Sequence, residues 1–244
     1  MNRLMRAEWY RVRKTYHLAA WTVIFCIFIT YIGYMDIGMD STVTGMDALN
    51  LFMEHGMLFV LYLPLLVGGM YVTSYENKIL SYEVMAGNKP STILLSKLLT
   101  VVPVISAVAF VLLISPVIFF GSRNGYGDTQ YLTAKVILLA VTCVRVVVCA
   151  MLIMTTFQSV IGMFAVFVRF ILLEGVGLIV VEILKEWNKA FDNLIFFFAG
   201  SAMNCVAMPE IPNKYLILCV VFSVVEMLIW YVLSYNSYKK RWFN

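Results

Sequence analysis

Charged side chains are scarce in this sequence, and their scarcity excludes an ordinary soluble domain. Asp, Glu, Lys and Arg make up 13% of the 244 residues, whereas an average soluble domain carries about 25%. Hydrophobic residue types make up 62% of the chain, which is more apolar surface than a soluble fold of this size buries. The composition therefore indicates a membrane protein.

Motifs for catalysis and metal binding are also missing. No G-x-x-x-x-G-K-[ST] loop occurs, and the segment 87–89 (Gly-Asn-Lys) lacks the first glycine and the hydroxyl that a phosphate cradle and magnesium need. His17 and His55 stand far apart without an H-E-x-x-H context, and there is no G-x-S-x-G nucleophile elbow. We therefore expect no catalytic residue, no metal site and no cofactor bound by this chain.

The few cysteines show no C-x-x-C spacing and lie mostly inside apolar runs. Such thiols behave as small buried hydrophobic groups rather than as disulfides or metal ligands. They are Cys26, Cys143, Cys149, Cys205 and Cys219.

Long hydrophobic runs are what the sequence has in abundance. A spanning helix needs roughly 20 mostly apolar residues. The predicted spans are about 18–35, 56–75, 98–120, 132–156, 161–183 and 215–236. Because they fill the chain, we predict an all-α membrane protein with six transmembrane helices in one domain over residues 1–244. No small-residue cleavage site follows the first run, so we expect it to be retained.

Basic residues gather in the N-terminal segment, in the segment 76–97 and in the C-terminal tail. The positive-inside rule places these three segments, and both termini, in the cytoplasm. This orientation requires an even number of spans, which depends on a tight turn within the apolar region 132–183. Polar residues and a glycine interrupt that region, so we place the turn around Thr155, Gln158 and Gly162.

The segment 1–17 is predicted to be an amphipathic helix in the membrane interface. Met5, Trp9, Val12 and Tyr16 form one apolar stripe at helical spacing. The cations and the aromatic residue expected at the headgroups are Arg3, Arg6, Trp9, Arg11, Arg13 and Lys14. A topology anchor would explain this pattern without any further function. The net charge of +4 fits anionic lipid beside the spans better than nucleic acid, which we do not expect as a partner.

Two segments carry a resemblance to a known family. The opening MNRLMRAEWYRVRKTYHLAAW resembles the start of ABC-2 type transporter permeases, in which an A-E-aromatic-x-K/R-x-K/R core precedes the first span. The matching residues are Ala7, Glu8, Trp9, Tyr10, Arg11, Arg13 and Lys14. The segment SYENKILSYEVMAGNKPSTILLSKLL is similar to the family's cytoplasmic segment after the second span. It has an acidic entry at Glu76, a glycine break at Gly87 and a return helix with Ser96 and Lys97. Family members often have a Ser-Arg pair after the glycine, where this chain has Asn-Lys-Pro-Ser.

The resemblance implies the transmembrane subunit of an ATP-driven exporter, similar to bacteriocin or lantibiotic immunity and peptide-export permeases of bacterial plasma membranes. It implies a second permease subunit, identical or paralogous, and a separate ATPase subunit that binds ATP and magnesium. It also implies a coupling helix after the second span, and we expect the ATPase to touch Glu76, Tyr82, Glu83 and Met85. A solvated loop followed by a helix that starts at Pro90 is the alternative interpretation.

Three charged residues, Arg145, Arg169 and Glu174, lie within apolar runs, where an unpaired ion costs at least about 2.5 to 3.5 kcal/mol. The predicted turn puts Arg145 and Glu174 at similar depth, so we expect them to pair. Such a pair could hold two helices together or line a polar pathway. We expect Arg169 to extend toward the cytoplasmic side, and Glu226 to pair within a bundle or dimer interface.

The segment between the last two spans contains an apolar stretch, 194–208, that is too short to span. Gly200 and Ser201 interrupt it, which favours a re-entrant or interfacial hairpin.

Two other function classes stay open on the sequence. A membrane scaffold or assembly protein would need no ATPase partner. An ion-coupled secondary transporter would need an intramembrane acid that titrates, and Glu174 and Glu226 are the obvious candidates.

Overall fold

The computed structural model describes most of the chain. The described residues are 2–14, 42–54, 57–76, 83–208 and 212–242, with five separate positions at 20, 24, 27, 28 and 31. Within them the chain is helical and contains no strand, which confirms the all-α prediction. The predicted first span, 18–35, lies almost entirely outside the described residues.

Eleven helical elements follow one another along the described residues. They are α1 (Asn2–Lys14), α3 (Gly45–Glu54), α4 (Met57–Glu76), α6 (Pro90–Asn124), α7 (Thr129–Phe157), α8 (Val160–Phe167), the π-helical η1 (Val168–Leu172), α9 (Leu173–Trp187), the 3₁₀-helical η2 (Lys189–Phe197), α10 (Ala199–Ala207) and α11 (Asn213–Trp242).

Four of the described helical segments are long and apolar enough to cross a membrane. They are α6, α7, the continuous run Val160–Trp187 and α11, and they coincide with four of the six predicted spans. The predicted second span is a 20-residue helix, α4, whose shorter part Val60–Tyr71 is apolar. These helices are compatible with a membrane protein, while the count of six stays a prediction.

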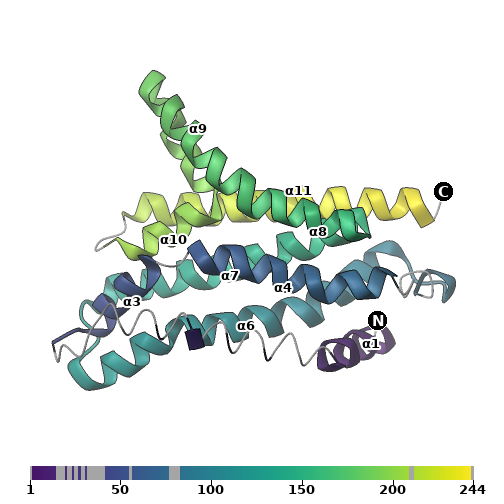
Figure 1. Ribbon diagram of the computed structural model, residues 1–244, viewed down its shortest axis with the longest axis horizontal. Helices are drawn as coiled ribbons and strands as arrows, with labels where there is room; N and C mark the ends of the chain where they lie inside the picture. Colours follow the sequence, from purple (N-terminus) through teal and green to yellow (C-terminus); the bar gives the residue numbers. More distant parts are fainter. Residues whose placement is uncertain are drawn as a thin grey trace.

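The helices form an elongated bundle with two distinct ends (Figure 1). Helix α1, the start of α6 and the C-terminal part of α11 lie toward one end, which we call the α1 end. Helix α3, helix α10 and the turn from α6 to α7 lie toward the other, which we call the α3 end. The described parts of the three basic segments identified in the sequence therefore lie toward the same end.

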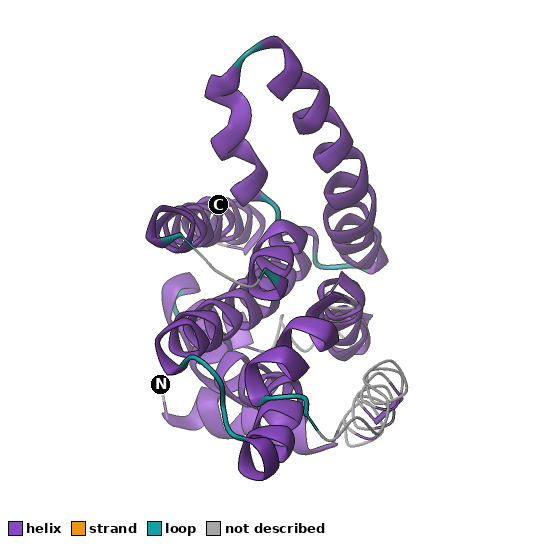
Figure 2. Ribbon diagram, turned by 90° about the vertical axis from the view of Figure 1, so that its left-hand side faces the viewer, coloured by secondary structure: helices purple, strands orange, loops and turns teal. Residues whose placement is uncertain are grey.

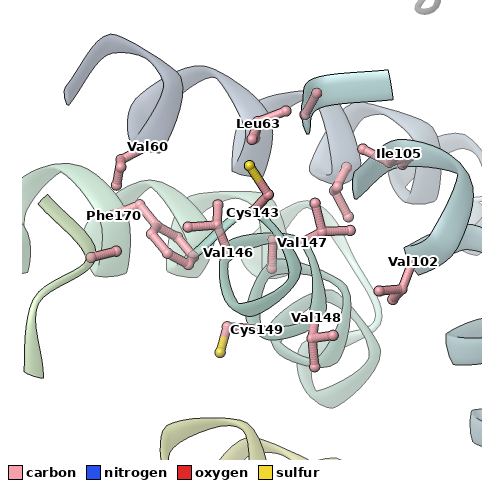
Figure 3. Close-up of a cluster of buried hydrophobic side chains, with 14 of the residues drawn as sticks. Val60, Leu63, Val102, Ile105, Cys143, Val146, Val147, Val148, Cys149 and Phe170 are labelled. Atoms are coloured by element: carbon pink, nitrogen blue, oxygen red, sulfur yellow. The ribbon is translucent and has the colours of Figure 1, made fainter. Parts of the chain in front are cut away.

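Helix α7 forms the centre of the bundle. Its residues 146–154 are all buried, and its side chains face several neighbouring helices. In Figure 3, Cys143 and Val147 lie among side chains such as Leu63 of α4 and Ile105 of α6, and Val146 lies near Phe170 of η1. A helix enclosed on all sides needs apolar residues around its whole circumference, which explains its uniform Val, Cys, Met and Leu composition.

The turn between α7 and α8 lies where the sequence predicts it. Gln158 adopts a left-handed conformation with φ of 51°, and its backbone N–H donates to the carbonyl of Met154 at 2.8 Å. The Ser159 hydroxyl then accepts the backbone N–H of Ile161 at 3.1 Å and starts α8. Two polar residues suffice to reverse the chain.

Helix α3 is an element that the sequence analysis missed. Thr44 and Asp47 cap it reciprocally, because the Thr44 hydroxyl accepts the Asp47 backbone N–H at 3.3 Å and the Asp47 carboxylate accepts the Thr44 N–H at 3.2 Å. Gly45 lets α3 approach α6 closely, since a Cβ there would lie 2.9 Å from the carbonyl oxygen of Val117. The segment is thus a packed helix.

Helix α9 leaves the bundle, and η2 and α10 lead the chain back (Figures 1 and 2). The break in the predicted apolar hairpin lies at Phe198, between η2 and α10. Gly200 and Ser201, where we expected the break, instead belong to the first turn of α10. Helix α10 then packs against α3 and α7, so the hairpin ends inside the bundle.

Candidate functional sites: two buried ion clusters

The first candidate site is a buried ion cluster at the α1 end, which we call the Lys97 cluster. It consists of Glu8 on α1, Glu83 at the start of the short helical segment 83–85 before α6, and Lys97 on α6. The Lys97 ammonium contacts the Glu8 carboxylate and lies 3.2 Å from Oε2 of Glu83. The Lys97 side chain is 0% exposed and those of Glu8 and Glu83 are 1% and 8% exposed. The ring centroid of Tyr71 is 5.8 Å from the ammonium.

Local structure holds these three residues together. The turn after Glu83 closes through a hydrogen bond from the Gly87 N–H to the Val84 carbonyl at 2.8 Å, and Gly87 has a φ of 77° that favours glycine. The Asn88 side chain donates to the Glu83 carbonyl at 2.8 Å. Pro90 then occupies the first position of α6, which places Lys97 two turns into that helix.

The buried face of α1 differs from the predicted apolar stripe. Leu4 and Glu8, four residues apart, are buried against the bundle, whereas Trp9 is 54% exposed and Met5 and Val12 are only half-buried. The ion pair with Lys97 accounts for the burial of Glu8, and the contact of the stripe with lipid stays a prediction. The sequence alone does not reveal that partner.

The cations of the predicted interfacial helix divide into two groups. The side chains of Arg3, Arg6 and Arg13 are exposed, as an interfacial position requires. Those of Arg11 and Lys14 lie outside the described residues.

The predicted ATPase-contacting residues are only partly described. Met85 is 78% exposed and is therefore accessible to a partner. Glu83 is different, because its carboxylate faces Lys97 inside the Lys97 cluster. Tyr82 and the side chain of Glu76 lie outside the described residues.

The second candidate site is a cluster of four charged residues inside the bundle, which we call the Arg145 cluster. Arg145 of α7 donates from Nε to Oε2 of Glu226 on α11 at 2.6 Å. Arg169 of η1 donates to Oε1 of Glu226 from Nε at 2.7 Å and to Oε1 of Glu174 from Nη1 at 2.7 Å. All four residues are at most 5% exposed, and their formal charges sum to zero.

The Arg145 cluster also holds the returning hairpin. The Glu174 carboxylate accepts the backbone N–H groups of Ala199 at 3.1 Å and Gly200 at 3.0 Å, which belong to the first turn of α10. Negative charge is favourable there because these N–H groups have no partner within the helix. Arg145 in turn donates to the carbonyl of Phe197 at the end of η2.

A π-helical turn explains how Arg169 and Glu174 meet. The two residues are five apart, and residues five apart do not share a face of a regular α-helix. The π-helix η1 spans Val168–Leu172, and its i to i+5 hydrogen bonding brings such residues to one side. The sequence analysis treated 161–183 as a uniform α-helix and could not foresee this alignment.

The structure corrects two expectations for the intramembrane charges. The expected Arg145–Glu174 pair is replaced by Arg145–Glu226 and Arg169–Glu174 contacts, so the expected partners are joined through two other side chains. Arg169 is buried within the cluster and does not extend to the end of the bundle. The expected pairing of Glu226 within the bundle is confirmed.

Four of the five cysteines are described. They are free thiols and all of them are buried, as expected from the sequence: Cys143, Cys149, Cys205 and Cys219. Among the described residues, no group of three or more His, Cys, Asp or Glu side chains could hold a metal ion.

Comparisons of the chain with protein-family models, with curated proteins and with solved structures find no match. The two clusters and the sequence of the chain are therefore the basis for a proposal on its function.

Proposed function

We propose that this chain is the transmembrane permease subunit of an ATP-driven ABC-2 type exporter in a bacterial plasma membrane, with both termini in the cytoplasm. A separate ATPase subunit would bind ATP and magnesium, and a second permease subunit, identical or paralogous, would complete the pathway. The substrate that we propose is an amphipathic or antimicrobial peptide, as in peptide export or bacteriocin self-immunity.

The observation that carries this proposal is the Lys97 cluster. Glu8 comes from one of the two segments that resemble the permease family and Lys97 from the other, and the two side chains are in direct contact. Each segment resembles the family by its own residues, so the contact between the two segments supports the proposal independently of either resemblance.

The same cluster offers a mechanical route from an ATPase to the spans. Met85 is exposed and lies two residues from Glu83, which is bound to Lys97. Because Lys97 belongs to the 35-residue helix α6, a force on the turn around Met85 would reach α6 through this contact. The Glu8–Lys97 contact would move α1 together with it.

The ion-coupled alternative receives less support from the Arg145 cluster. Its candidate acids, Glu174 and Glu226, each contact at least one arginine. Both carboxylates are engaged in contacts that join α7, η1, α10 and α11, which favours a role in holding these elements together. The scaffold alternative predicts that no ATPase subunit is bound, and copurification separates it from the exporter.

The test is copurification from the native membrane in mild detergent, with the bound chains identified by mass spectrometry. We expect a P-loop ATPase to copurify with the wild-type protein and to be lost with Met85→Arg, because the new charge would occupy an exposed apolar contact. Met85 is chosen over Glu83 because a Glu83 variant would disrupt the buried Lys97 cluster.

Two control variants make the result specific. Met85→Leu keeps an apolar side chain and should retain the ATPase. Trp187→Arg introduces the same charge at an 82% exposed position, at the end of α9, and should also retain it. Recovery of no ATPase with the wild-type protein would contradict the exporter proposal and favour the scaffold or ion-coupled alternative.

A further inference from the structure

A cavity of about 220 Å³ lies near the α3 end, between α9, η2, α10 and the start of α11. It is several times larger than the volume of about 30 Å³ that one water molecule occupies in the liquid. Its polar lining comes from Lys185, Asn193, Ser201, Asn204 and Lys214. Neither cluster described above contributes a side chain to it.

Ser201 is an unsatisfied polar group in the wall of this cavity. The residue is 3% exposed, and its hydroxyl has no hydrogen-bond partner within the described part of the chain. A buried hydroxyl without a partner costs about 1 to 3 kcal/mol. A ligand that fills the cavity and accepts a hydrogen bond would remove this cost.

The cavity also has a cation suited to an anionic ligand. Lys214 lies in the first turn of α11, its side chain is exposed, and no ion pair of Lys214 occurs within the described residues. Lys185 brings a second ammonium group to the same lining, and none of the described residues that line the cavity is acidic. The polar wall therefore combines positive charge with hydrogen-bond donors.

Part of the lining is apolar. It includes Ile195, Phe196, Met208 and Tyr215, and the Phe196 and Tyr215 ring centroids lie 4.8 Å apart. A ligand that matches the whole lining carries a compact anionic group and an adjoining apolar part.

We propose that this cavity binds a phosphate group, either that of an anionic phospholipid or soluble phosphate, with Lys214 supplying the charge and Ser201 a hydrogen bond. Phosphate accepts hydrogen bonds on several oxygens, so it can use the hydroxyl, an amide and an ammonium group at once. This inference is independent of the export proposal, because it concerns residues at the other end of the bundle from the Lys97 cluster.

The test uses the full chain in phosphatidylcholine nanodiscs. Retention of added phosphatidylglycerol is measured by native mass spectrometry, and binding of inorganic phosphate is measured by calorimetric titration. We expect Lys214→Gln to weaken binding of the probe that the wild-type protein binds about tenfold, which corresponds to about 1.4 kcal/mol. Ser201→Ala should also weaken it, since alanine keeps Cβ, adds no bulk and cannot donate.

The control is Arg123→Gln, which removes an exposed cation at the same end of the bundle. Arg123 lies over the Phe119 ring at 4.3 Å, outside the cavity, so this variant should bind like wild type. Binding of phosphatidylglycerol alone would identify a lipid site, and binding of inorganic phosphate would identify a site for the soluble anion. Wild-type protein that binds neither probe, or Lys214 and Ser201 variants that bind like wild type, would overturn the proposal.

Discussion

Glu226 is the residue on which the Arg145 cluster depends most, so Glu226→Gln tests the cluster directly. The Glu226 carboxylate receives Arg145 on one oxygen at 2.6 Å and Arg169 on the other at 2.7 Å. A glutamine has almost the same shape but offers one acceptor oxygen and no charge. One of the two arginines would therefore lose its acceptor.

The expected magnitude follows from the charge sum. The wild-type cluster has two arginines and two glutamates, all buried, whereas the variant leaves one positive charge without a counter-charge. Breaking a buried ion pair by removing one partner costs about 3 to 5 kcal/mol. Since the amide keeps one hydrogen bond, we expect a loss of about 3 kcal/mol in the free energy of unfolding.

The assay is reversible unfolding in mixed micelles, titrated with SDS and followed by tryptophan fluorescence. Glu182→Gln is the matched control, because Glu182 is an exposed glutamate of α9 and its neutralisation should change stability by less than about 0.5 kcal/mol. The double variant Arg145→Gln plus Glu226→Gln restores a charge sum of zero. Its loss should be smaller than the sum of the two single losses by at least about 1 kcal/mol.

Two outcomes would refute this reasoning. A loss below about 1 kcal/mol for Glu226→Gln would mean that the carboxylate is not the shared partner of two buried arginines. Strict additivity in the double variant would mean that Arg145 and Glu226 do not interact.

Two further predictions concern the Lys97 cluster and the contact between α3 and α6. Lys97→Met should lower the free energy of unfolding by about 3 kcal/mol, because two buried carboxylates lose their ammonium partner. Lys97→Arg keeps the charge and should lower the free energy of unfolding less in the same SDS titration. Equal losses for the two variants would contradict the role of the charge. Gly45→Ala should cost about 1 to 3 kcal/mol, since its Cβ would lie 2.9 Å from a backbone oxygen. Gly175→Ala is the control, because a Cβ at Gly175 meets nothing within 4 Å. Equal unfolding temperatures for the two variants would contradict the close approach of α3 to α6.

Apolar run lengths alone predicted the helices that could cross a membrane. Four predicted spans coincide with long apolar helices, because a run of about 20 apolar residues has few other stable conformations in a membrane protein. The sequence also predicted the tight turn at Gln158, since two polar residues and a nearby glycine interrupt an otherwise apolar region. Both inferences depend only on neighbours along the chain.

The partners of the buried charges depended on more distant parts of the chain. Glu226 is separated from Arg145 by 81 residues, and no local pattern marks it as the shared partner. Glu8 and Lys97 are 89 residues apart, and their contact buries a charged side chain of α1 that no local pattern marks as buried. Spacing within one helix could not reveal either contact.

The sequence by itself thus determined that this chain is helical and apolar, that it reverses near Gln158, and that its intramembrane charges need partners. Only the tertiary structure decided which charges meet, because the π-helical turn of η1 and the packing of α11 on α7 set their directions. It also decided that Ser201 and Lys214 line one cavity, since that cavity is formed by four elements that no local sequence pattern brings together.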